Sequence, residues 1–402
     1  MATPSATPEA QAGAAVPEEE LAAWLRFALS PVSPKLQRSL LAAFGLPEQV
    51  FAQSRTNIAS VVGADAANAL LAGSNPAALE TALAWAGETG NHILTLADTA
   101  YPRPLLEIAD PPLVLYVKGD PALLGLPALA IVGSRTASTQ GEANAEAFAH
   151  SLNAAGLTIV SGLALGIDTA AHRGALVAEG GRTVAVVGTG LDRIYPARNA
   201  DLAREIAARG AIISEFPLGT PPLPHNFPRR NRLIAGLALG VLVVEAALNS
   251  GSLITARAAA EAGREVFAIP GSIHSPLTRG CHLLIRQGAK LVESAEDVFE
   301  ELRARLGNEL PPRPGRAKNP RSRRTSGESR PEYGRMPANL APEAVHVLEA
   351  LGDAGRDIDS LALATGIAVE ALHVHLLALE LEGIVARQSG GGFLRLHRPG
   401  RS

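Results

Sequence analysis

Short apolar runs alternate with longer helix-like segments through the middle of the chain. The runs are continuous, rich in β-branched residues and too short to be helices, which is typical of strands buried on both faces of a parallel sheet. They span residues 113–117, 128–132, 157–160, 183–187, 211–214, 241–245, 266–269 and 289–292. The helical patterns between them span residues 139–155, 167–179, 201–209, 233–239, 253–262, 281–287 and 295–306. This alternation predicts an α/β fold, with a doubly wound parallel sheet covered by helices on both faces.

A purely helical pattern precedes the sheet region. Leucine and aromatic residues recur at helical spacing from residue 21 to about residue 90, and Gly45-Leu46-Pro47 stops one helix and starts the next. We predict a small helical domain of the SAM/HhH type over residues 21–100. Helix pairs of this kind can bind backbone phosphates, but we favour packing or a partner surface. Residues 1–20 are rich in Ala and Pro and then acidic, which predicts a disordered tail.

The composition changes again after the sheet domain, which we place at residues 101–307. Residues 308–338 are rich in Pro, Arg and Ser without apolar periodicity, which predicts a basic linker. Three helical patterns and two strand patterns follow, and together they predict a winged-helix domain over residues 339–398. The helical patterns span residues 342–351, 359–365 and 369–382, and the strand patterns span residues 383–388 and 392–396.

The third of these helices is unlike a DNA-recognition helix. It carries Glu370, Glu380 and Glu382 together with His373 and His375, but no Arg or Lys. A recognition helix that enters the major groove is usually basic. A protein-contact or vestigial role is therefore at least as good an interpretation as DNA binding.

The composition narrows the functional classes. The formal net charge is −3 over 402 residues, so nucleic-acid binding would have to come from local clusters of positive charge. The single cysteine, Cys281, excludes an internal disulfide and a Cys-based zinc site, and no other metal-ligand spacing occurs. The N-terminus lacks the pattern of a signal peptide, and no uncharged apolar run is long enough to span a membrane. We therefore expect a cytoplasmic protein that holds no metal and contacts no membrane.

The strongest cluster of positive charge lies just before the apolar run at residues 233–239. Arg229, Arg230 and Arg232 supply forked donors suited to phosphate, and Phe227 supplies a flat ring on which a base can stack. Downstream, a Gly-Ser turn at residues 251–252 precedes a helix, whose N-terminus favours negative charge. The arginines could instead be solvated surface charges, and Phe227 a core residue. Because the cluster accompanies the Gly-Ser turn, we favour an anion-binding site.

Glycine-bearing turns follow several predicted strands, and ligands of such sheets bind where the strands end. The turns lie at residues 133–135, 161–162, 188–190 and 251–252. None matches the dinucleotide-binding or the ATP-binding glycine pattern, so we expect no nucleotide cofactor and no ATP hydrolysis. Asp168 and His172 lie four residues apart on one predicted helix face, where an acid–base or metal pair is conceivable. We favour a structural role for Asp168 at the helix start, with His172 as a polar residue lining the site.

Several segments resemble the motifs of the DNA-processing protein A (DprA/Smf) family and occur in the family's order. They are Ile131-Val132-Gly133-Ser134-Arg135, Ser161-Gly162-Leu163-Ala164-Leu165-Gly166-Ile167-Asp168, Ser214-Glu215-Phe216-Pro217, Phe227-Pro228-Arg229-Arg230-Asn231-Arg232-Leu233-Ile234-Ala235-Gly236 and Gly251-Ser252-Leu253-Ile254-Thr255-Ala256. The resemblance covers roughly residues 105–306. It implies an extended Rossmann-like fold that forms a homodimer, and a non-enzymatic, single-stranded DNA-binding recombination mediator of natural transformation. Such a protein protects incoming single-stranded DNA and loads the RecA recombinase onto it.

The same resemblance implies a positively charged pocket that binds the DNA. By motif, its residues here would be Gly133, Ser134, Arg135, Ser161, Gly162, Phe227, Arg229, Arg230, Asn231, Arg232, Gly251, Ser252 and Thr255. The loop at residues 273–278 departs from the Gly-Asn-Pro run that many members carry, so its contribution to the pocket stays open.

Two other functions fit parts of the sequence. The sheet also looks like that of the nucleotide phosphoribohydrolase (lysine-decarboxylase-like) enzymes, which place a glutamate just after a Gly-Gly-x-Gly-Thr turn. Here Ala256 and Arg257 follow the comparable turn, and Glu245 precedes it on the strand. The missing acid argues against the enzyme. A transcription factor that uses the winged helix is the third possibility, and the acidic third helix argues against it.

Overall fold

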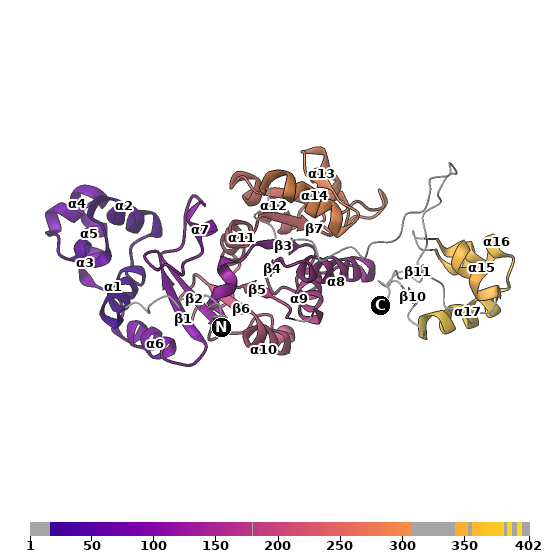
Figure 1. Ribbon diagram of the computed structural model, residues 1–402, viewed down its shortest axis with the longest axis horizontal. Coiled ribbons are helices and arrows are strands. Elements are labelled where there is room, and N and C mark those ends of the chain that lie inside the picture. Colours follow the sequence, from indigo (N-terminus) through magenta and orange to yellow (C-terminus); the bar gives the residue numbers. More distant parts are fainter. Residues whose placement is uncertain are drawn as a thin grey trace, which may run out of the picture.

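The computed structural model describes residues 17–178, 180–306, 342–352, 356–381, 384–387 and 392–395. Figure 1 shows helices at the N-terminal end in indigo, the sheet with its covering helices in the middle, and a small C-terminal unit in gold. Most of the predicted tail, the predicted linker at residues 308–338 and the turn between the last two strands lie outside the described residues.

Residues 18–86 form a layer of short helices. They are α1 (Glu18–Ala28), α2 (Pro34–Phe44), α3 (Pro47–Phe51), α4 (Arg55–Val62), α5 (Ala64–Ala72) and α6 (Pro76–Ala86). Proline opens three of them, where its missing N–H costs nothing, and Gly45 ends α2 with a φ of 90°. Their core of Trp24, Phe27 and Leu40 is continuous with Tyr116 on the sheet. The helical layer therefore packs directly on the sheet.

The sheet has nine strands in the order β1-β2-β6-β5-β4-β3-β7-β8-β9. The strands are β1 (Asn91–Thr95), β2 (Val114–Gly119), β3 (Ala128–Val132), β4 (Thr158–Ser161), β5 (Thr183–Val186), β6 (Ala211–Ser214), β7 (Gly240–Val243), β8 (Glu265–Ala268) and β9 (Lys290–Leu291). In this order, every neighbouring pair of strands from β6 across the sheet to β9 is parallel, which confirms the predicted doubly wound sheet. Two antiparallel pairs, β1 with β2 and β2 with β6, extend it at one edge.

Helices cover both faces of this sheet. They are α7 (Arg103–Leu106), α8 (Thr139–Ala154), α9 (Ile167–Val177), α10 (Ala200–Arg209), α11 (Asn226–Leu237), α12 (Ser252–Glu261), α13 (Arg279–Arg286) and α14 (Ala295–Leu306), with 3-10 turns η1 (Pro121–Gly125) and η2 (Ala197–Asn199). Alternate residues of β3 reach opposite cores, as the two-residue period of a strand requires. Ile131 belongs to the core that contains Leu152 of α8, and Val132 to the core that contains Leu233 of α11.

The start of α11 differs from the sequence expectation. We expected the arginine cluster to precede an apolar helical run, but the helix begins at Asn226 and includes the whole cluster. Pro228 is tolerated because it lies in the first turn, where backbone N–H groups have no intrahelical acceptor. Consecutive residues of a helix point about 100° apart. The three arginines therefore cannot all face one site.

The C-terminal residues form a winged-helix unit, as the sequence predicts. Helices α15 (Pro342–Leu351), α16 (Ile358–Thr365) and α17 (Val369–Leu381) precede an antiparallel hairpin of β10 (Val385–Arg387) and β11 (Phe393–Arg395). Leu348, Leu361, Leu376 and Phe393 belong to a core of its own. Among the described helices, none alone has the length and apolar character needed to cross a membrane; α16 and α17 meet those criteria only as a pair bent by 109°.

Candidate functional site

A cavity of about 660 Å³ lies at the carboxyl ends of β3 and β7. The chain runs from β3 through β4, β5 and β6 in one direction along the sheet, and from β7 through β8 and β9 in the other. The two loops that leave β3 and β7 therefore diverge, which opens a crevice between them. Residues of both loops, of α11 and of the start of α12 line this crevice, which we call the switch-point pocket.

Most residues that the sequence predicted as a site meet in this pocket. They are Gly133, Ser134, Arg135, Phe227, Arg230, Asn231, Gly251, Ser252 and Thr255. Those from the loops after β3 and β7 come together because parallel strands end at the same edge of a sheet. The side-chain amide of Asn231 donates to the carbonyl of Gly251 at 3.3 Å and so joins α11 to the start of α12.

Arg230 supplies a buried positive charge at the base of the switch-point pocket. Only 4% of the residue is exposed, and its guanidinium donates to the carbonyl of Val186. Its Nε has no hydrogen-bond partner among the described residues. Burial lowers the pKa of Arg230 to about 10, and nearby Asp168 opposes that shift. The guanidinium is charged at neutral pH and has donor capacity left for an anion.

Asp168 holds the loop beneath the pocket. Its Oδ2 accepts from the backbone N–H groups of Gly162 at 3.1 Å and of Ala164 at 3.3 Å, at the start of α9. Burial raises its pKa, while Arg230 and these hydrogen bonds lower it. A side chain at Gly162 would collide with both Asp168 and Arg230, so the glycine lets the two charges approach. This geometry fits the structural role that we favoured for Asp168.

Ser161, Gly162 and His172 lie below the switch-point pocket rather than on its lining. The hydroxyl of Ser161 is buried and donates to the carbonyl of Ile131 at 2.6 Å. His172 was interpreted from the sequence as a lining residue, and this interpretation is wrong because the side chain is fully buried. Its Nδ1 pairs with the hydroxyl of Thr183 at 2.7 Å. Burial lowers the pKa of His172 to about 3.

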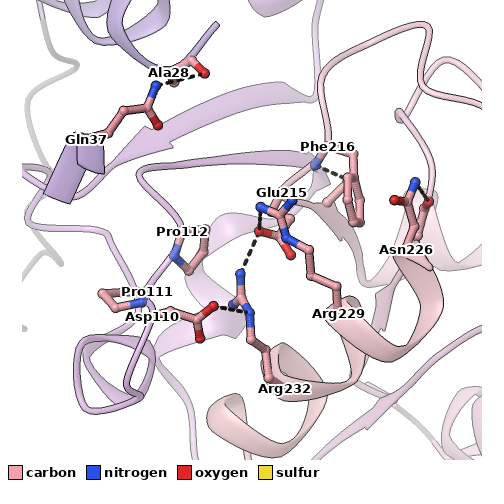
Figure 2. A network of polar contacts seen from close by, with 12 residues as sticks. Ala28, Gln37, Asp110, Pro111, Pro112, Glu215, Phe216, Asn226, Arg229 and Arg232 are labelled. Atoms are coloured by element: carbon pink, nitrogen blue, oxygen red, sulfur yellow. Dashed lines mark hydrogen bonds and ion pairs between the residues drawn. The ribbon is translucent and has the colours of Figure 1, made fainter. Parts of the chain in front are cut away.

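The structure does not bring Arg229 and Arg232 into the switch-point pocket. The two residues lie one helical turn apart on the other side of α11, as their i, i+3 spacing requires. Figure 2 shows both of them directed at Glu215, which follows β6. Their Nη2 atoms lie 2.8 and 2.6 Å from its Oε2, and Nε of Arg232 lies 3.0 Å from Oδ2 of Asp110. The Glu215 side chain is only 2% exposed. These arginines therefore neutralise a buried acid.

An aromatic pair lies at the rim of the pocket. The ring centroids of Tyr195 and Phe227 are 5.6 Å apart, with the planes inclined by 44°. The guanidinium carbon of Arg135 lies 5.4 Å from the centre of the Phe227 ring, within the range of a cation–π interaction. Tyr195 was missed from the sequence, because it lies in a loop without periodicity. The available signal was the loop's position directly after the glycine-bearing turn at residues 188–190, which follows a predicted strand.

Glu245 has a role at the end of β7 that the sequence did not indicate. Its carboxylate accepts from the backbone N–H of Ser138 at 2.9 Å and from the Ser138 hydroxyl at 2.5 Å. Burial raises the pKa of Glu245. Ser138 caps α8 and follows the loop that carries Arg135. Glu245 therefore fixes that loop. No group of three or more His, Cys, Asp or Glu suited to a metal ion occurs among the described residues.

Comparison with known proteins matches both the sheet domain and the winged-helix region to the same family of proteins. The sequence model of the DNA recombination-mediator protein A family matches residues 92–303, and that of the DprA winged helix domain matches residues 331–391. The chain is 42% identical to Protein Smf of Escherichia coli over 321 residues. This aligned region covers 80% of this chain and 81% of that protein.

Two further similarities involve Streptococcus pneumoniae. Its DNA processing protein DprA is 52% identical over 207 residues, which is 52% of this chain and 73% of that protein. The X-ray structure of DNA processing protein A from this species superimposes with a TM-score of 0.62 at 40% identity. The match covers 71% of this chain and 98% of that one.

Proposed function

Because the chain belongs to the DNA recombination-mediator protein A family, we propose that its switch-point pocket binds single-stranded DNA. The positive charge of Arg230, which is buried and lines this pocket, carries the proposal. A positive charge at the base of an open pocket attracts a phosphate, and Arg135 adds a second charge at the rim.

The other features of the pocket fit a strand that is held without regard to its sequence. The first residues of α12 line the cavity, and the positive end of the helix dipole favours an anion there. Aromatic rings at the rim accept any base, because every base has a π-face. None of these contacts reads a base edge, so we expect affinity with little sequence preference.

We extend the proposal to the rest of the function that the family implies. The protein would protect incoming single-stranded DNA in natural transformation, load RecA onto it, act as a homodimer and catalyse no reaction. Glu245 supports the last point, because Ser138 occupies both of its carboxylate oxygens and it therefore lacks the freedom of a catalytic acid. The cytoplasmic location expected from the sequence stays a prediction.

The first experiment is a salt titration of binding to single-stranded and duplex oligonucleotides, with an assay for free base released from nucleoside monophosphates. We expect tight, salt-sensitive binding that favours the single strand, without turnover. The slope of log K against log salt then measures how many phosphates the protein neutralises. Turnover with weak DNA binding would contradict the proposal in favour of the phosphoribohydrolase, and Glu245 would be the first residue to mutate.

A further inference from the structure

Tyr195 lines the switch-point pocket but has no part in binding a phosphate. It lies in the loop between β5 and η2 and lines the switch-point pocket, yet 43% of the residue is exposed. A large ring held at the rim of a pocket loses favourable burial unless a ligand covers it. Its place beside the proposed phosphate-binding arginines calls for a flat, apolar ligand group.

Phe227 has less open ring surface than Tyr195. Its ring packs against Tyr195 and under the guanidinium of Arg135. The backbone at Gly188 approaches it so closely that a methyl group there would lie 3.2 Å from Cδ1 of the ring. Phe227 is therefore partly enclosed and supports Tyr195 from inside. Tyr195 is left as the outer ring of the pair.

The walls near Tyr195 suit a base rather than a second phosphate. Pro222, Pro224 and Pro228 line the pocket together with the two rings, and the charges of Arg135 and Arg230 lie beside these apolar groups. A nucleotide combines the same two features, a flat apolar face and an anionic group. The pocket thus offers matched surfaces to both parts of one nucleotide.

We propose that Tyr195 is a stacking residue for one unpaired nucleobase of the bound strand. The proposal rests on the proposed function, since it assigns a ligand group within that site. Stacking on Tyr195 requires a base whose face is free, and a base inside a duplex would first have to leave its neighbours and its partner. Tyr195 therefore contributes to the preference for single strands without adding sequence preference.

The test compares Tyr195→Ala and Tyr195→Phe with Ile194→Ala in the full-length protein. Ile194 is the preceding residue, is 45% exposed and does not line the switch-point pocket. We expect Tyr195→Ala to lower the affinity for a thymidine oligonucleotide by about 5- to 100-fold, the range expected for loss of one stacked base. Tyr195→Phe and Ile194→Ala should bind as the wild type does. The salt slope should not change, because no phosphate contact is lost.

Two further measurements separate stacking from a general structural effect. An oligonucleotide with abasic sites should bind the wild type more weakly, and Tyr195→Ala should no longer distinguish it from the intact strand. In Tyr195→Trp, the emission of the new indole should be quenched when the intact oligonucleotide binds, against a background from Trp24 and Trp85, which are buried.

The outcomes distinguish the stacking role of Tyr195 from the proposed single-strand binding by the pocket. If the wild type binds the single strand and Tyr195→Ala binds equally well, stacking on Tyr195 is overturned while the proposed function stands. The same holds if the loss is as large on the abasic strand, because the base is then not what the ring contacts. If the wild type does not bind the single strand, the proposed function fails and the stacking role fails with it.

Discussion

Arg135 provides the simplest residue-level test of the switch-point pocket. Its side chain is exposed at the rim, and the described structure places it over Phe227. Because a phosphate contact carries no sequence information, Arg135→Ala should weaken binding of single strands of every sequence and reduce the salt slope by about 1. Binding isotherms at several salt concentrations measure both effects.

Arg204→Ala is the matched control for that substitution. Arg204 is an exposed arginine on α10 that pairs with Asp201 at 2.6 Å, and it does not line the pocket. Its removal changes the net charge by the same amount as the removal of Arg135. Equal losses in the two variants would mean that overall charge, rather than a contact, determines affinity. Unchanged affinity in Arg135→Ala would remove this residue from the site.

His172 should make the protein sensitive to acid. The Thr183 hydroxyl donates to the carbonyl of Ile159, so it must accept from Nδ1–H of His172, which leaves Nε2 as a buried, unprotonated nitrogen. The folded-state pKa is about 3, lowered by burial and then by the charge of Arg230. The unfolded chain binds a proton near pH 6.5, so stability falls as the pH drops from about 6.5 towards 3.

Denaturant unfolding at pH 7.5 and pH 5.5 tests whether the free energy of unfolding falls as the pH drops. The contribution of His172 should fall by about 1.4 kcal/mol between the two values. His172→Asn is the comparison, because its amide can still donate to Thr183 but does not titrate. The wild type should lose more stability than the variant over this interval. Equal losses would show that His172 takes up its proton in the folded protein.

The residue scale also shows what the sequence could not reveal about the pocket. Gly133, Ser134 and Arg135 were correctly expected to lie near Gly251 and Ser252, since the ends of parallel strands are neighbours. Arg229 and Arg232 were grouped with Arg230 because the sequence did not reveal where α11 begins. Once the helix includes all three, their spacing places two of them on the face that meets Glu215.

At the scale of elements, the buried parallel strands and the winged helix were predictable, whereas β1 was not. Continuous β-branched runs mark strands that are covered on both faces. β1, at Asn91–Thr95, begins with two polar residues and pairs with only one strand at the edge of the sheet. It lies within the range that we assigned to the helical domain, and its antiparallel pairing depends on β2, which no local pattern reveals.

Glu245 links two elements, and this link is testable. Its carboxylate at the end of β7 holds Ser138, which in turn caps α8 by accepting from the N–H of Gly141 at 3.0 Å. Glu245→Ala leaves the Ser138 N–H without its acceptor and should lower the free energy of unfolding by about 1–3 kcal/mol. The affinity for single strands should also fall, because the neighbouring loop carries Arg135. Thermal unfolding and DNA binding measure the two effects.

Ser138→Ala is the partner control for this link. It removes the hydroxyl that contacts Glu245 and caps α8 but retains the backbone N–H, so the expected loss of stability is about 1 kcal/mol. If Glu245→Ala changed neither stability nor affinity, the link would have no positioning role. Glu245 would then be available for chemistry, as the enzyme alternative requires.

At the scale of the whole molecule, charge is distributed unevenly between the parts. The net charge is −3, but two arginines lie at the switch-point pocket. Helices α15, α16 and α17 carry Glu343, Glu349, Asp359, Glu370 and Glu380 but no Lys or Arg. An acidic helical surface repels a polyanion, so the main DNA site should not lie on these helices.

Deletion of residues 340–402 tests whether the main DNA site lies outside the winged-helix unit. The winged-helix unit has its own hydrophobic core, and none of its described residues contributes to the cores around the sheet, so the remaining chain should stay folded. The affinity for single strands should change by less than about tenfold, and the salt slope should be kept, because both pocket arginines remain. A collapse in affinity while thermal unfolding of the sheet is unchanged would place the main site on the winged helix. In the expected case, the exposed Leu363, Val374 and Leu377 on that unit would be free for a contact other than DNA, consistent with the protein-contact role that its acidic third helix indicates.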